Sequence, residues 1–300
     1  MTRILSAALA PSTQSSYRRA WQSLRSFYQE HFTGKLTLPV TESLLAMYIT
    51  DMHRNGLAAN TIATSVSAIS YLHKLYNFKN PADSFVVKKL LTAMRKKTPA
   101  IDRRLPISRP ILHALVDALP FIVGSGYNYV LFKALFLFMF YACTRIGEVT
   151  FTTNDNVSHI LGLQDIVIWH PGCSVSSSLE VNFTNFKHSH SPHVINISCQ
   201  TAPYCPISAV AEFITLREQK PGPLFCMPDQ QPIKRDYFMT QFNACLQYCG
   251  LNTNYYKSHS FRVGAASEAA TSGMSDTQIR NLGRWKSDAF KLYTRQPVQF

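Results

Sequence analysis

Two motifs between residues 143 and 262 combine residue types that bind a phosphate group. Arg145 lies in Cys-Thr-Arg-Ile-Gly-Glu, directly after a long hydrophobic run, and Glu148 follows three residues later. This pairing indicates either a salt bridge at a helix end or a clamp for an anion. His259 and Arg262 stand three residues apart, which places both side chains on one helix face. A guanidinium offers paired donors and an imidazole can shuttle a proton, so together they suit the non-bridging oxygens of a phosphate. A solvated His–Arg pair is just as common at this spacing.

A lysine and a tyrosine complete the set of candidate residues. Lys187 lies at the turn between two predicted strands, and Tyr293 lies near the C-terminus in Phe-Lys-Leu-Tyr-Thr-Arg. A phenol has a pKa near 10, so only about one in a thousand is ionised at pH 7. It acts as a nucleophile only beside cations or a base. Taken singly, Lys187 is typical of an exposed hairpin lysine and Tyr293 of a packed aromatic residue. A catalytic role for either one depends on the other candidate residues.

The charge of the chain indicates a polyanionic partner. The 300 residues carry a net charge of +13, with a pI near 9.5. Residues 1–104 hold 15 Lys and Arg against 5 Asp and Glu, so most of the excess lies in the first third. This asymmetry predicts a DNA-gripping segment joined to a domain with another task; the alternative is a basic protein with a solvated face. A hydrophobic content of 46% argues against global disorder.

Neither a disulfide framework nor a membrane span is predicted. The seven cysteines are scattered and form no Cys-x-x-Cys pair, which indicates reduced, intracellular thiols. The first residues contain only a short apolar stretch, which argues against a secretory signal. The most hydrophobic run, Val130–Ala142, contains Lys133 and is too short to cross a bilayer, so we expect a buried helix there.

Residues 1–98 are expected to form a bundle of four helices. Four amphipathic patterns with short connections follow one another in this range. Ser12 or Thr13 could cap the first helix and Thr41 the second, and the third could start at Asn60. The fourth helix follows Pro81 and is expected to bury one apolar face, made up of Val86, Val87, Leu90, Leu91 and Met94.

Residues 99–110 are expected to link this bundle to a second domain, residues 111–300. Three prolines, with Arg103 and Arg104 among them, predict a stiff basic linker without helix. The second domain mixes helical and strand patterns, which predicts a mostly helical α+β domain with one small antiparallel sheet. Helices are predicted near 108–118, 127–143, 206–219, 235–249, 260–272 and 275–284, and strands at 165–169, 179–183 and 193–198.

Taken together, the order Arg145, Lys187, His259, Arg262 and Tyr293 resembles the active-site order of tyrosine recombinases such as the Xer proteins, Cre and lambda integrase. The local sequences are similar too. Ala-Cys-Thr-Arg-Ile-Gly-Glu-Val resembles the family's first-arginine motif, and Ser-His-Ser-Phe-Arg-Val-Gly-Ala-Ala its His-x-x-Arg helix. The bundle resembles the core-binding domain of the family, so the resemblance covers nearly the whole chain. It implies a mainly helical protein with an N-terminal core-binding bundle and a catalytic domain.

The resemblance implies a mechanism of DNA strand exchange. Tyr293 would attack the scissile phosphate and leave a 3′-phosphotyrosine and a free 5′-hydroxyl. Arg145 and Arg262 would hold the non-bridging oxygens. Lys187 would protonate the departing oxygen, and His259 would move the tyrosine proton or bind the phosphate. No cofactor or metal is implied, because one phosphodiester is exchanged for another of similar energy.

Three further residues would support this chemistry. Glu148 would orient the catalytic arginines. The family's second histidine, which is Trp in Cre, has two candidates here, because counting forward from Arg262 reaches Trp285 and counting back from Tyr293 reaches Arg284. We favour Trp285, whose indole N–H can donate to a phosphate oxygen, and expect Arg284 to act from behind it. The Gly-Arg-Trp sequence resembles recombinases of eukaryotic mobile elements of the DIRS or Crypton kind.

The resemblance also implies double-stranded DNA as the partner, bound by a tetramer of this chain, with no small-molecule substrate. The protein would act inside the cell, in the nucleus if eukaryotic and in the cytoplasm or nucleoid if bacterial. The basic residues expected to hold the DNA backbone are Arg18, Arg19, Lys88, Lys89, Arg95, Lys96, Lys97, Arg103 and Arg104.

Three alternatives stay open. A type IB topoisomerase uses related chemistry, and a domesticated protein could retain the fold and bind DNA without cutting it. A metal site at His188, His190 and His193, with Cys199 and Cys205 nearby, is the third, although the spacing fits no zinc motif closely.

Overall fold

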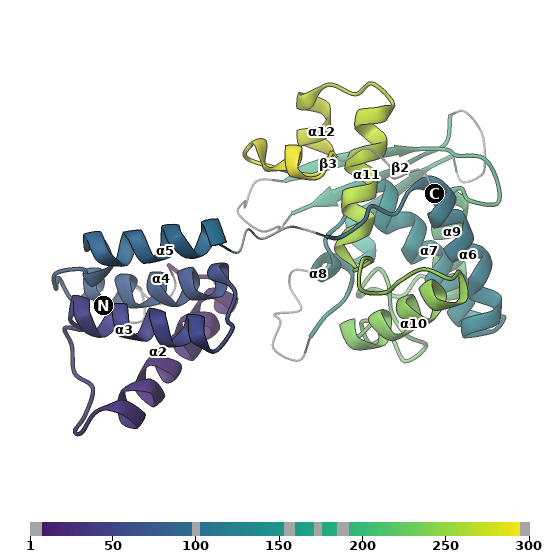
Figure 1. Ribbon diagram of the computed structural model, residues 1–300. Helices are drawn as coiled ribbons and strands as arrows, with labels where there is room; N and C mark the ends of the chain where they lie inside the picture. Colours follow the sequence, from purple (N-terminus) through teal and green to yellow (C-terminus); the bar gives the residue numbers. More distant parts are fainter. Residues whose placement is uncertain (1–7, 98–102, 153–159, 171–175, 185–191, 295–300) are drawn as a thin grey trace. The chain divides into compact units, whose positions relative to one another are not determined.

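The protein divides into two compact units, Met1–Asp102 and Arg103–Phe300 (Figure 1). The computed structural model describes residues 8–97, 103–152, 160–170, 176–184 and 192–294. Each unit has its own hydrophobic core. The expected fold class is confirmed, because the described residues form mainly helices and one small antiparallel sheet. No helix among these residues is long and apolar enough to cross a membrane.

In the part of the N-terminal unit that the structure describes, four helices pack in two pairs. Helix α2 lies against α4, and α3 lies against α5. Leu24, Ile49 and Ile69 are fully buried between them. The helices and one short 3-10 turn are α2 (Pro11–His31), α3 (Glu42–Arg54), α4 (Ala59–Leu75), η1 (Pro81–Asp83) and α5 (Phe85–Lys97).

Helix starts in this unit follow the predictions only in part. The Thr41 side chain accepts a hydrogen bond from the Leu44 N–H at the start of α3, so this predicted cap is confirmed. The predictions for Ser12 or Thr13 and for Asn60 are wrong. Helix α2 begins at Pro11, because proline in the first turn has no N–H that needs a partner, and α4 begins one residue before Asn60.

A buried histidine connects two segments of this unit. His73 is fully buried; its Nε2 accepts a hydrogen bond from the Val40 N–H at 2.8 Å, and its Nδ1 lies 2.7 Å from the Ile69 carbonyl. It therefore ties the segment before α3 to the end of α4.

Val86 was expected inside α5 but is 55% exposed, because the buried face of α5 is centred on Val87 and Met94.

The C-terminal unit is built around a helix buried on all sides, as its sequence predicted. Helix α7 (Tyr127–Tyr141) packs against α6, α9 and α11 (Figure 1). Its residues from Leu131 to Phe140 are buried apart from Lys133, which reaches Glu212 at 3.6 Å. The surrounding helices are α6 (Arg109–Val123), α8 (Ile146–Val149), α9 (Pro206–Leu216), α10 (Arg235–Tyr248), α11 (His259–Thr271) and α12 (Asp276–Leu282).

A three-stranded antiparallel sheet covers part of this core. Its strands β1 (Ile166–Trp169), β2 (Ser178–Phe183) and β3 (His193–Ser198) pair in the order β1-β2-β3. Side chains alternate between buried and accessible along β2 and β3, because the sheet buries only one face. Short 3-10 turns precede β1 at Leu163–Asp165 (η3) and end the described chain at Asp288–Leu292 (η4).

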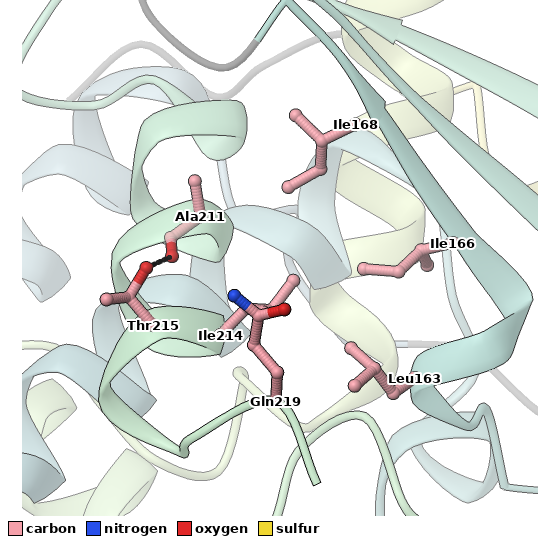
Figure 2. Close-up of a pocket in the computed structure, with 7 residues that line it drawn as sticks. All are labelled: Leu163, Ile166, Ile168, Ala211, Ile214, Thr215 and Gln219. Carbon is pink, nitrogen blue, oxygen red and sulfur yellow. Dashed lines mark hydrogen bonds between the residues drawn. The ribbon is translucent and has the colours of Figure 1, made fainter. Parts of the chain in front are cut away.

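An open groove lies between β1 and α9 (Figure 2). Its volume is about 470 Å³, and its walls are mainly apolar. None of the candidate catalytic residues lines it. The lining residues are Leu163, Ile166, Ile168, Ala211, Ile214, Thr215 and Gln219.

The segment before α6 lies against the helix that carries His259 and Arg262. The Leu105 and Ile107 N–H groups donate to the carbonyls of Tyr255 and Ser260. The prediction that the prolines exclude helix as far as Pro110 is wrong for the last two residues of the linker. Helix α6 begins at Arg109, and Pro110 occupies the first turn, where its missing N–H costs nothing.

Glycine at position 264 is required by this packing. A Cβ atom there would lie 1.9 Å from the carbonyl oxygen of Ile107, which is backbone and cannot rotate away. We expect Gly264→Ala to lower the free energy of unfolding of the C-terminal unit by about 2 kcal/mol, despite alanine's better helix propensity. Urea denaturation measures the change. Gly147→Ala is the control, because its Cβ meets only the flexible end of Arg235 at 3.2 Å; equal stability of the two variants would contradict the prediction.

Candidate active site

The turn after α7 places Arg145 next to Glu148. The chain leaves the helix through Cys143, whose φ of +48° is in the left-handed region. Arg145 then precedes the short helix α8. Both carboxylate oxygens of Glu148 are used: Oε2 accepts from the Arg145 N–H at 2.8 Å, and Oε1 accepts from Nη1 at 3.0 Å. The Arg145 side chain keeps 25% of its surface exposed, so its remaining donors can reach a ligand.

Arg262 is held behind this turn by main-chain oxygens. It lies on α11 and is 1% exposed. Its Nη1 donates to the Cys143 carbonyl and its Nη2 to the Gly283 carbonyl. Burial lowers the pKa of Arg262, and the positive charge of Arg145 adds to this effect, while Glu148 and Tyr293 oppose it. The guanidinium therefore has a fixed orientation and shares one electrostatic environment with the other candidates.

Tyr293, near the C-terminus, packs against the same group of residues. It follows η4, and its ring lies 5.0 Å from that of His259 in an edge-on arrangement. On another side it stacks on Trp285 at 5.5 Å, and the Arg262 guanidinium lies over the same indole at 4.2 Å. The structure thus brings Arg262, His259, Trp285 and Tyr293 together, although they span three separate elements. Tyr293 is only partly buried.

The two candidates for the second-histidine position have different surroundings. Trp285 is in contact with Arg262 and Tyr293. Arg284 has φ +55°, and its side chain is 0% exposed. Its Nη2 donates to Glu148 Oε2 at 2.7 Å, and its guanidinium lies 3.5 Å from the centre of the Phe183 ring. Burial lowers the pKa of Arg284 to about 10, against the opposing pull of Glu148.

Glu148 consequently bridges Arg145 and Arg284. The expectation that it orients both catalytic arginines is wrong in detail, because the side-chain donors of Arg262 are held by carbonyl oxygens. Sequence reasoning missed these carbonyls and the Phe183 ring. No side-chain pattern could indicate the carbonyls, since their direction depends on the left-handed backbone at Cys143.

Lys187 lies outside the described residues. The strands on either side of it end near the site, however. Phe183 and His193 are the last described pair of β2 and β3, and Phe183 contacts Arg284. Burial lowers the pKa of His193, so this histidine favours its neutral form.

The basic residues expected to hold DNA are accessible on the separate elements that carry them. Arg18 and Arg19 are exposed on α2, and Arg103 is exposed before α6 while Arg104 is half-buried. The remaining five are exposed on α5, where Lys88 also lies 3.8 Å from Asp83: Lys88, Lys89, Arg95, Lys96 and Lys97.

The described residues contain no group of three or more His, Cys, Asp or Glu side chains that could hold a metal ion. Of the histidines considered for such a site, His188 and His190 lie outside the described residues.

Removing the charge of Glu148 is expected to destabilise the C-terminal unit strongly. In Glu148→Gln the buried Arg284 would lose its counter-charge, and we expect a loss of about 3 kcal/mol in the free energy of unfolding. Chemical denaturation checks this. Glu268→Gln is the control, because its bridge to Arg109 has the similar length of 2.8 Å but is 33–44% exposed, where a pair contributes less than about 1 kcal/mol. Similar losses in the two variants would show that Arg284 does not depend on Glu148.

Known proteins resemble this chain in sequence and in fold. No family model matches the chain. A curated protein from Selenomonas ruminantium, described as an integrase/recombinase XerD homolog, is 24% identical over 299 residues, which cover 95% of this chain and 82% of the relative.

Three solved structures have a similar fold at 13% sequence identity. They are the XerH site-specific recombinase bound to a palindromic difH substrate (TM-score 0.66; 93% of this chain and 75% of that one), the Tn1549 transposon integrase with circular-intermediate DNA (0.62; 97% and 91%) and a lambda integrase dimer bound to a core site (0.62; 98% and 74%). The chain therefore has the fold of these recombinase and integrase structures, and its sequence is similar to that of the curated recombinase homolog over nearly the whole of this chain.

Proposed function

We propose that this protein is a site-specific DNA recombinase that cuts and rejoins strands through a covalent bond between DNA and Tyr293. The similarity to a recombinase and to integrases supports this role. The observation that carries the chemistry is the position of the Tyr293 ring. It lies against His259 and Trp285, and the Arg262 guanidinium lies over the indole of Trp285.

The proposed cleavage step is a transesterification. The Tyr293 oxygen attacks the phosphorus, a P–O bond forms to tyrosine, and the bond to the 5′ oxygen breaks. Arg145 and Arg262 donate to the non-bridging oxygens, where charge accumulates in the transition state. His259 takes the phenol proton or binds the phosphate, and Lys187 gives a proton to the departing oxygen. The attack of the free 5′-hydroxyl on the phosphotyrosine reverses these steps and rejoins a strand.

Trp285 is proposed to fill the second-histidine position and Arg284 to act as its support. Trp285 already contacts Arg262 and Tyr293, which is where a donor to the phosphate must stand. The Arg284 side chain is paired with Glu148, so it is proposed to act on the site through this carboxylate and the neighbouring backbone. Glu148 links this support to Arg145.

Double-stranded DNA is the proposed partner, since the similar XerH and integrase structures contain DNA. The exposed cations of α2, α5 and the segment before α6 would contact its phosphates, with the N-terminal unit as core-binding domain and the C-terminal unit as catalytic domain. Binding should therefore weaken steeply with salt. A tetramer on two duplexes is the proposed assembly, and an origin in a eukaryotic mobile element stays a prediction.

The test is covalent trapping on DNA. Nicked duplexes would be made from the repeats that flank the gene, so that cleavage releases a short fragment and cannot be reversed. We expect a DNA adduct that survives denaturing electrophoresis and maps to Tyr293 by mass spectrometry. Specific binding without any adduct would favour the non-catalytic alternative. Relaxation of supercoiled DNA by a monomer, without pairing of two sites, would favour a topoisomerase.

A further inference from the structure

Two thiols face one another in the loop between the sheet and α9. Cys199 follows Ser198, the last residue of β3, and Cys205 precedes Pro206, the first residue of α9. Their sulfur atoms are 3.6 Å apart. A disulfide bond is about 2.05 Å long, so the sulfurs are already in van der Waals contact and need to close by about 1.5 Å. Only five residues separate the two cysteines, and side-chain rotation with a small loop shift can supply that movement.

The two sulfurs differ in access. Cys199 is half-buried, whereas Cys205 is 1% exposed. A dissolved oxidant would therefore reach Cys199 first, and Cys205 would be the neighbouring thiol that reacts with the oxidised sulfur.

The other described cysteines are less suited to such a reaction. Cys143 and Cys226 are fully buried. Cys245 and Cys249 stand four residues apart on and after α10, and the Cys249 sulfur donates to the Ala114 carbonyl. Burial raises the pKa of Cys245 to about 12 and also raises that of Cys249, so little thiolate is present there at neutral pH.

We propose that Cys199 and Cys205 form a redox modification site that a peroxide converts to a disulfide. In the first step the Cys199 thiol is oxidised to a sulfenic acid, and hydrogen peroxide is reduced to water. In the second step the Cys205 thiolate attacks that sulfur, the S–S bond forms, and the sulfenic oxygen leaves as a second water molecule. Two thiols and one peroxide thus give one disulfide and two waters, and a dithiol reductant reverses the change.

The surroundings allow the bond without disturbing either element. Next to Cys205, Tyr204 stacks on His113 with ring centres 3.7 Å apart, and its hydroxyl donates to the Asp117 carboxylate at 2.8 Å. This end of the loop is therefore anchored on α6. On the other side, Ile197 of β3 is buried in the core. The disulfide would tie the end of β3 to the start of α9.

A zinc site is the competing use of two close thiols. Thiolates that share a zinc ion lie about 3.8 Å apart, close to the observed separation. A structural zinc site needs four ligands, however, and the described residues contain no group of three or more His, Cys, Asp or Glu side chains.

Mass spectrometry of the full chain tests the proposal. Cys199 and Cys205 fall in one tryptic peptide, between Lys187 and Arg217. The reduced protein would be treated with hydrogen peroxide, its remaining thiols alkylated, and its peptides mapped. We expect this peptide to lose two hydrogen atoms and to escape alkylation, with recovery after reduction by dithiothreitol. The peptides of the other cysteines should stay alkylated.

Single variants separate the two roles. In Cys205→Ser the sulfenic acid of Cys199 should persist and react with dimedone, whereas Cys199→Ser should leave Cys205 alkylated. The double variant Cys245→Ser/Cys249→Ser is the matched control and should form the disulfide as the wild type does. Alkylation of both thiols after peroxide, or sulfinic acid on Cys199 beside an alkylated Cys205, would overturn the proposal. So would one tightly held zinc ion per purified chain that is lost in Cys199→Ser.

Discussion

The Tyr293→Phe variant is expected to form no covalent complex with nicked DNA that the wild type cleaves. Phenylalanine keeps the ring that packs against His259 and Trp285, so the site should stay folded. It lacks the oxygen that would attack phosphorus, and no other group can replace it. The adduct, measured on denaturing gels, should fall by at least about a thousandfold, the scale seen when a nucleophile is removed. The Kd for the same DNA, measured without denaturant, should change less than about threefold, because the phosphate contacts are made by cations.

Tyr248→Phe is the matched control for this change. Tyr248 ends α10, is 55% exposed and stacks on Phe121 away from the candidate site. Its variant loses the same hydroxyl group from the same unit and should cleave like the wild type. A covalent adduct that persists in Tyr293→Phe would exclude Tyr293 as the nucleophile, and the adducted peptide would identify the residue that acts in its place.

Arg262→Lys is expected to slow cleavage by about a hundredfold to a thousandfold, which is the usual effect of losing one preorganised donor to a developing negative charge. The planar guanidinium donates in two directions, to the carbonyls of Cys143 and Gly283, and lies over the Trp285 ring. A lysine ammonium is a point charge that cannot satisfy both carbonyls and stack as well. Single-turnover cleavage with saturating protein isolates this step from DNA binding.

The control for Arg262→Lys is a second buried arginine in the same unit. Arg217 is also 1% exposed, and its Nη2 donates to the Lys220 carbonyl at 2.8 Å and to Gln230. It lies at the end of α9, outside the candidate site. Arg217→Lys should destabilise the unit to a similar degree in denaturation experiments while leaving the cleavage rate of folded protein unchanged. Equal slowing by both variants would mean that Arg262 acts only through stability.

Most elements of the fold could be predicted from the sequence, because the signals for them are local. The long hydrophobic run of α7 indicated a buried helix, and the alternation in β2 and β3 indicated strands with one buried face. The Thr41 cap likewise depends on neighbouring residues alone. Errors arose where two local signals competed, as at Pro110, which suits both a linker and the first turn of a helix.

The sequence by itself determined which residues could do the chemistry and in what order they occur, since residue type and spacing are properties of the chain. Only the tertiary structure decided which partner each of these side chains contacts. Arg284 and Trp285 are adjacent, yet one is buried against Glu148 and the other lies against Arg262 and Tyr293. That division depends on the left-handed backbone at Arg284 and on the carbonyl of Cys143, which accepts from Arg262 across 119 residues of sequence. Such contacts form between distant segments, and no local pattern in the sequence records them.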